Sequence, residues 1–127
     1  MKYLLDTNII VDHLRGRQAI KPEILESGAV ISIITLGELL YGAHKSESPK
    51  DSLNKLRDVL EILDLAILNL DTEIVGVFGE IKVRLERLGT RLEDFDLLIA
   101  ATVKVFDLTL VTRNMRHFER ISELKLK

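Results

Sequence analysis

Residues 1–15 read MKYLLDTNIIVDHLR, and this stretch decides the fold class. Residues 2–5 form a short, mostly apolar run that Asp6 ends, and this pattern predicts a buried strand. Thr7 or Asn8 can cap a helix that follows at once and runs to about Arg15. A buried strand that leads directly into a helix is typical of the repeating unit of α/β proteins.

The same alternation continues along the chain, with short joints between the elements. We expect further strands at residues 29–33, 65–70 and 108–111, and a short last strand at 121–126. We expect helices at residues 19–26, 35–44, 49–63, 71–88 and from 96 onward, and a helical turn at 115–120. Strands separated by helices predict parallel pairing with right-handed crossovers. The sequence thus predicts one α/β domain over residues 1–127, a three-layer α/β/α sandwich with a mostly parallel central sheet.

Composition excludes several classes of function. There is no cysteine, so disulfides, zinc-thiolate sites and thiol catalysis are excluded. The net charge of −2 excludes a protein that grips nucleic acid through a global positive field. Six Phe and Tyr residues are too few and too scattered in the sequence to predict a base-stacking platform. No apolar stretch approaches the ~20 residues of a membrane span, and we expect a cytoplasmic protein.

Four polar residues fall near the predicted carboxyl ends of strands. Asp6 follows the first predicted strand, and Glu38 lies in the first turn of the helix that follows the second strand. Asp96 begins a buried helix, and Asn114 follows the strand at 108–111. In parallel α/β sheets the functional cleft lies at this edge. The four side chains are therefore candidates for one catalytic site, although they are far apart in the sequence.

Each acid also has a structural interpretation. Asp6 and Asp96 can each serve as a helix N-cap. Thr35 and Glu38 match the capping box, in which the glutamate accepts from the Thr35 amide. We interpret Asp12 as a helix-surface residue, and no single acid decides between structure and chemistry.

A divalent cation explains why such acids would converge. Crowded carboxylates repel one another, and part of them would take up protons to relieve the repulsion. Mg²⁺ prefers oxygen ligands in octahedral geometry and keeps several of its waters, and Mn²⁺ accepts similar ligands. A cation held in this way can activate water and offset charge on a phosphodiester. The pattern predicts a Mg²⁺ site in which Mn²⁺ can substitute.

Four segments, taken together, resemble the PIN-domain family and, within it, the VapC-type toxins of toxin–antitoxin pairs. They are Leu4–Ile10, Thr35–Gly42, Asp96–Ala101 and Leu110–Asn114, and they occur in the family's order and spacing over nearly the whole chain. The resemblance implies a metal-dependent endoribonuclease, a homodimer, and a cognate antitoxin protein whose tail blocks the active site. Some relatives cut a single tRNA at its anticodon stem-loop.

Carried over by position, the resemblance implies that Asp6 and Asp96 bind the metal directly. Glu38 would complete the acidic cluster, directly or through water. One departure is Asn114, where many members carry an aspartate; a neutral amide holds a second metal less well, so we expect one well-occupied ion. Asp94 could partly compensate for the missing charge.

Other residues are candidates for supporting roles. Thr7, Asn8, Thr112 and Asp94 are predicted to support the metal ligands through hydrogen bonds. Arg113 and Arg116 flank Asn114, and we expect them to meet RNA phosphate. His13, His44 and His117 have no metal-ligand spacing, and we interpret them as surface or packing residues.

Two alternatives to the nuclease stay open at this point. An acid after the first strand also marks phosphoaspartyl phosphatases and receiver domains. The former need a second acid at the position of Asn8, and the latter an acid after the third strand where only Asp71 is available. The other alternative is a PIN-like module that binds RNA or protein without turnover, which Asn114 favours.

Overall fold

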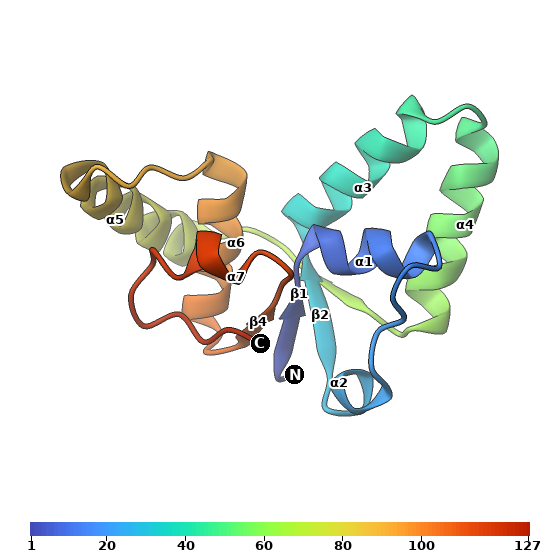
Figure 1. Cartoon of the computed structure of the whole chain (residues 1–127), viewed down its shortest axis with the longest axis horizontal. Coiled ribbons are helices and arrows are strands. Elements are labelled where there is room, and N and C mark those ends of the chain that lie inside the picture. The colour runs from blue at the N-terminus through green and yellow to red at the C-terminus, as the bar shows by residue number, and fades with distance from the viewer.

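The computed structural model describes residues 1–127, and four strands alternate with seven helices (Figure 1). The predicted order of elements is confirmed up to the helical turn that begins at Met115. In chain order they are β1 (Tyr3–Leu5), α1 (Thr7–Leu14), α2 (Pro22–Glu26), β2 (Ala29–Ser32), α3 (Ile33–Lys45), α4 (Pro49–Ile62), β3 (Ala66–Leu68), α5 (Thr72–Leu88), α6 (Asp94–Val105), β4 (Thr109–Val111) and α7 (Met115–Phe118).

The four strands form one sheet in the order β3-β2-β1-β4, and all neighbouring strands are parallel. β1 lies in the middle, where Leu4 pairs with Val30 of β2 and with Leu110 of β4. The strand order reverses between β1 and β4, which is where α/β sheets open their functional cleft. The predicted last strand is wrong, because residues 121–126 contribute only an isolated bridge between Leu126 and Leu110.

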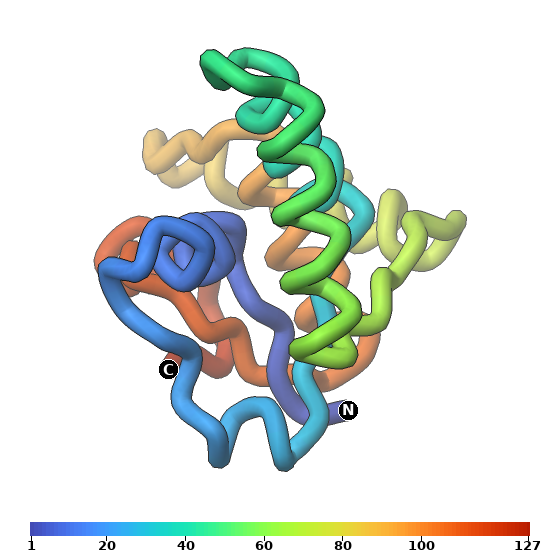
Figure 2. The backbone as a smooth tube through the Cα atoms, turned by 90° about the vertical axis from the view of Figure 1, so that its right-hand side faces the viewer, coloured from blue at the N-terminus to red at the C-terminus, as the bar shows by residue number.

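Alternate strand residues face two separate cores, as the two-residue period of a strand requires. Leu4 and Leu110 pack with α5, α6 and α7 on one face, whereas Leu5 and Ile31 pack with α1, α2, α3 and α4 on the other. Figure 1 shows the sheet between these two groups of helices, and Figure 2 shows α4 running along the outside of the second group. The predicted three-layer sandwich is confirmed.

Three helix starts differ from the prediction. α2 begins at Pro22 rather than at residue 19, because proline fits the first helical position and residues 15–21 form a turn and an extended segment. α3 begins at Ile33, since Ser32 rather than Thr35 accepts a backbone N–H at the cap. α6 begins at Asp94, two residues before Asp96. None of the seven helices is long and apolar enough to cross a membrane.

Candidate functional site

Asp6 lies at the centre of the sheet's carboxyl edge, between β1 and α1. Its backbone N–H donates to the Val111 carbonyl of β4 at 2.9 Å, which fixes it beside the neighbouring strand. Its Oδ1 accepts from the Thr7 N–H at 2.9 Å, and its Oδ2 accepts from the Thr112 hydroxyl at 2.8 Å. Asp6 therefore caps α1, as the structural interpretation held, but it also faces the end of β4.

The environment of Asp6 disfavours its charge. The residue is only 5% exposed, and burial raises the pKa of its carboxyl group above the ordinary value. The hydrogen bonds from Thr112 and Thr7 oppose this shift, whereas the negative charge of Asp96 adds to it. A buried acid that a second acid makes harder to ionise is a group that a nearby cation would stabilise.

Glu38 reaches the same edge from α3, on the other side of α1. Its Oε1 accepts from the Thr7 hydroxyl at 2.7 Å, and the Thr35 hydroxyl oxygen lies 3.1 Å from that of Thr7. The capping-box interpretation is wrong, because Ser32 caps the helix and Thr35 is fully buried inside it. Thr7 therefore contacts both acids: its backbone N–H donates to Asp6, and its hydroxyl group donates to Glu38.

Asp96 enters from the first turn of α6, on the opposite face of the sheet. Its side chain is 29% exposed, and its Oδ2 lies 2.8 Å from Nε2 of His117 on α7. Oδ1 of Asp96 makes no hydrogen bond. The sequence did not predict this contact, since the histidines lack metal-ligand spacing and we interpreted His117 as a surface or packing residue.

Thr112 links two of the predicted site residues. Its hydroxyl donates to Asp6 and accepts from the Asn114 backbone N–H at 3.0 Å. Asn114 itself caps α7 without a side-chain hydrogen bond, and it is exposed. Thr112 thus holds the Asp6 carboxylate and the chain that leads to Asn114 in one arrangement.

Asp12 is not the helix-surface residue that the sequence predicted. It is 4% exposed, and its Oδ2 lies 2.7 Å from Nε of Arg113. Its Oδ1 has no hydrogen-bond partner, and the nearest cation there is Arg17 at 4.0 Å. The reason lies in the fold, because the face of α1 that carries Asp12 is turned toward the end of β4, and Arg113 covers the Asp12 side chain there. The Arg113 side chain still remains 56% exposed.

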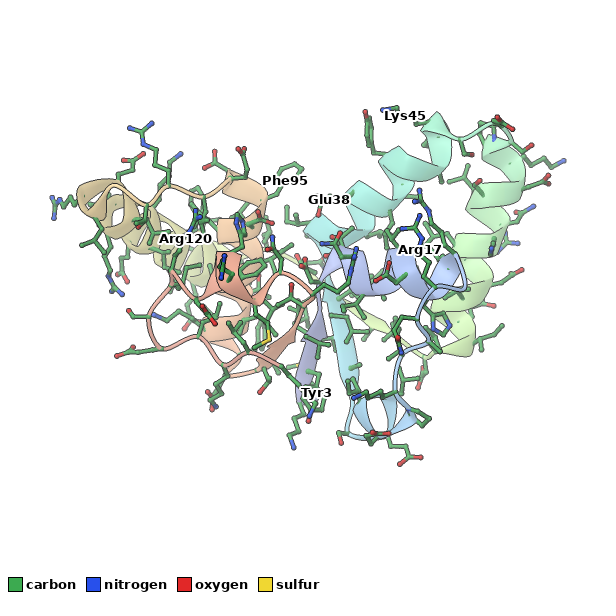
Figure 3. The ribbon with its side chains drawn as sticks, viewed as in Figure 1. Tyr3, Arg17, Glu38, Lys45, Phe95 and Arg120 are labelled. Carbon is green, nitrogen blue, oxygen red and sulfur yellow. The ribbon has the colours of Figure 1, made fainter.

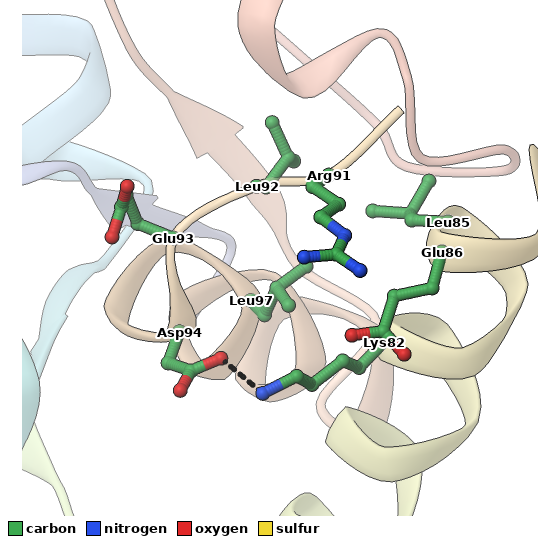
Figure 4. A pocket seen from close by; sticks show the side chains of 8 residues that line it. All are labelled: Lys82, Leu85, Glu86, Arg91, Leu92, Glu93, Asp94 and Leu97. Atoms are coloured by element: carbon green, nitrogen blue, oxygen red, sulfur yellow. Dashed lines mark hydrogen bonds and ion pairs between the residues drawn. The ribbon is translucent and has the colours of Figure 1, made fainter. Parts of the chain in front are cut away.

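Asp94 points away from the central acids. Its Oδ1 lies 2.9 Å from Nζ of Lys82 on α5, and both residues line a hollow of about 180 Å³ between α5 and α6 (Figure 4). The hydrogen bond that Lys82 donates to Asp94 raises the pKa of Lys82. This hollow contains neither Asp6 nor Asp96, so it is separate from the candidate site.

Asn8 is half-buried and Arg116 exposed, and neither side chain is held by a hydrogen bond or an ion pair.

An open cleft adjoins Glu38. It has a volume of about 710 Å³, and Thr7, Glu38, Tyr41 and Phe95 are among its lining residues. Figure 3 shows Glu38 and Phe95 on the two sides of the opening between the helix groups. Tyr41 and Phe95 are both exposed. Although the aromatics are scattered in the sequence, the fold brings two of them to the same cleft.

The donor set fits a hard divalent cation. Asp6, Glu38 and Asp96 offer only oxygen ligands, which Mg²⁺ and Mn²⁺ prefer. Oε2 of Glu38 and Oδ1 of Asp96 make no hydrogen bond, and each Asp6 oxygen makes one, which leaves a lone pair. In this arrangement no three acidic or histidine side chains are close enough to ligate one ion directly.

Comparisons with known proteins show the family of this chain. The PIN domain model matches residues 3–124. The chain is 37% identical to Ribonuclease VapC2 of Haemophilus influenzae over 98% of this chain and 96% of that protein. It is 33% identical to the tRNA(fMet)-specific endonuclease VapC of Shigella flexneri, with 98% and 96% covered.

A solved structure has the same fold over the full length. VapBC2 from Rickettsia felis, bound to a DNA fragment from its promoter, gives a TM-score of 0.91 at 33% identity, with 100% of this chain and 98% of that chain covered. Family model, relatives and structure all extend from β1 to the last residues, and none is confined to a single motif. This chain belongs to the PIN-domain family.

Proposed function

We propose that this chain is a metal-dependent endoribonuclease that acts as the toxin of a toxin–antitoxin pair. The observation that carries the proposal is the buried Asp6 carboxylate, whose charge burial and Asp96 both disfavour, at the point where the strand order reverses. Structural acids are usually placed where their charge is favoured, whereas an acid whose pKa is shifted by burial and by a specific charged neighbour indicates a functional site. Relatives of the same length are named as ribonucleases.

Three acids would hold the ion. Asp6 and Asp96 are the candidates for direct ligands, and Glu38 completes the acidic set directly or through water. No three of these side chains converge closely enough in this arrangement for a fully protein-bound ion. When bound, Mg²⁺ or Mn²⁺ supplies positive charge against a phosphodiester and increases the acidity of water. One ion fits this donor set better than two, since Asn114 adds no charge.

The chain's own residues would orient the metal ligands and bind the RNA. Thr112 and the Thr7 N–H fix the two oxygens of Asp6, and the Thr7 hydroxyl fixes Glu38. Arg113 and Arg116 are exposed beside this edge and would bind RNA phosphate, with Asp12 setting the direction of Arg113. The net charge of −2 is consistent with such local rather than global contacts.

The partners follow from the same proposal. A VapC-type toxin would form a homodimer and bind a cognate antitoxin protein, and it would act on cytoplasmic RNA. One relative is named as specific for tRNA(fMet), which makes tRNA the first substrate to test for this chain.

Cleavage of RNA tests the proposal. Purified total tRNA and a generic single-stranded RNA would be incubated with the chain in Mn²⁺ or Mg²⁺, with chelator, and with Asp96→Asn prepared identically. We expect metal-dependent cleavage that falls at least about 100-fold in the variant, the loss expected when one catalytic electrostatic group is removed. Antitoxin-free, folded protein that cuts neither RNA with either metal would contradict the nuclease and favour a binding module.

A further inference from the structure

His117 is the one titratable side chain in contact with the central acids that the proposed chemistry does not use. Its Nε2 lies 2.8 Å from Oδ2 of Asp96, across 21 residues of sequence. The two side chains are 22% and 29% exposed, so the contact is neither deeply buried nor freely solvated. The imidazole is also among the groups that lower the pKa of Asp6. His117 therefore contacts Asp96 directly.

The local structure holds the imidazole in place. His117 lies in the short helix α7, which begins directly after the Thr112–Asn114 segment. The next residue, Phe118, is buried in the core, and its ring packs edge-on against the imidazole, with ring centroids 5.3 Å apart. The backbone N–H of His117 donates to the Asn114 carbonyl at 3.1 Å. The backbone of His117 is thus fixed by the start of α7, and its ring rests against a buried side chain.

We propose that His117 is a positioning residue of the metal site, which holds the Asp96 carboxylate through Oδ2 so that Oδ1 is presented for the ion. The inference rests on the proposed metal dependence. An ionised carboxylate only accepts hydrogen bonds, so Nε2 is the ring nitrogen that carries hydrogen in this pair. The second oxygen, Oδ1, is then the one left without a partner.

The physical effect is preorganisation. A carboxylate on a helix can rotate, and a ligand that must be reoriented on binding loses affinity. Hydrogen bonds from a neighbouring side chain to a ligating carboxylate typically change metal affinity by about 10–100-fold. Since α7 follows β4, His117 also couples the orientation of Asp96 to the chain segment whose Thr112 holds Asp6.

The test is a binding measurement that does not depend on activity. The affinity of the full chain for Mn²⁺ would be measured by isothermal titration calorimetry for wild type, His117→Leu and His117→Gln. Leucine removes the donor, whereas the glutamine amide can place a donor near the position of Nε2. His44→Leu is the matched control, because His44 is exposed near the end of α3 and makes no hydrogen bond. Melting curves in chelator would verify that each variant is folded.

We expect Mn²⁺ to bind His117→Leu about tenfold or more weakly than wild type, and His117→Gln and His44→Leu within about threefold of it. Unchanged or tighter binding by folded His117→Leu would overturn the positioning role while leaving the metal site in place. Equal loss in the leucine and glutamine variants would also overturn it, because the donor would not be the cause. A wild-type chain that binds no Mn²⁺ would overturn the metal dependence itself and this inference with it.

Discussion

Burial of Asp6 makes ionisation of its carboxyl group unfavourable for folding. Because the folded state holds this proton more tightly than the unfolded chain, stability falls as the pH rises from the ordinary Asp pKa of about 3.8 through the raised folded pKa. We therefore predict that Asp6→Asn raises the free energy of unfolding in chelator at pH 7, and that this gain disappears below pH 3.8. Urea unfolding across pH tests this, with Asp107→Asn as the exposed control. A destabilised variant at pH 7 would contradict it.

Sequence position alone predicted the location of Asp6 and Thr112, because residues that follow neighbouring parallel strands share one edge. It could not predict the partners of Asp12 and His117. Each of these contacts joins side chains from elements that only the tertiary fold brings together, Asp12 with Arg113 and His117 with Asp96. A helix-surface interpretation of Asp12 fails for the same reason, since burial depends on what covers the helix.

The start of α3 decides how Glu38 is presented. Ser32 is fully buried at the end of β2, and its Oγ accepts the Ile34 N–H at 3.0 Å. We predict that Ser32→Ala lowers the free energy of unfolding by about 1 kcal/mol, as loss of an N-cap does, and that Thr35→Val, which keeps the side-chain shape, costs less. Thermal and urea unfolding of both variants gives the comparison. A larger cost for Thr35→Val would mean that the buried hydrogen bond between Thr7 and Thr35 contributes more to stability than the cap at Ser32.

The chain's local patterns indicated every helix but not every helix start. The pattern Thr35–Glu38 is a valid capping box in isolation, yet β2 turns into α3 without a loop, so the cap falls at Ser32. α2 begins at Pro22, whereas the predicted helix began at residue 19 because the residues before the proline include apolar ones. One of them, Ile20, is buried but is not helical. Tertiary packing overrides short-range propensity at such joints.

The overall architecture was the most predictable level, since buried strands alternating with amphipathic helices admit few other arrangements. The distribution of the site between the layers was not. Thr7 and Glu38 belong to helices on one face of the sheet, Asp96 and His117 to helices on the other, and Asp6 and Thr112 to the sheet edge between them. An ion held by these acids would therefore connect both helix layers to the sheet.

This arrangement predicts that metal binding stabilises the whole molecule. At a free Mn²⁺ concentration 100 times the dissociation constant, the free energy of unfolding should rise by about 2.7 kcal/mol. Hydrogen exchange should slow together at the starts of α1, α3, α6 and α7, whereas the far end of α4 should change only as much as global stability does. Mass spectrometry with and without Mn²⁺ measures this, and Asp96→Asn is the control. Protection confined to α6 and α7 would mean that Glu38 and its layer take no part in holding the ion.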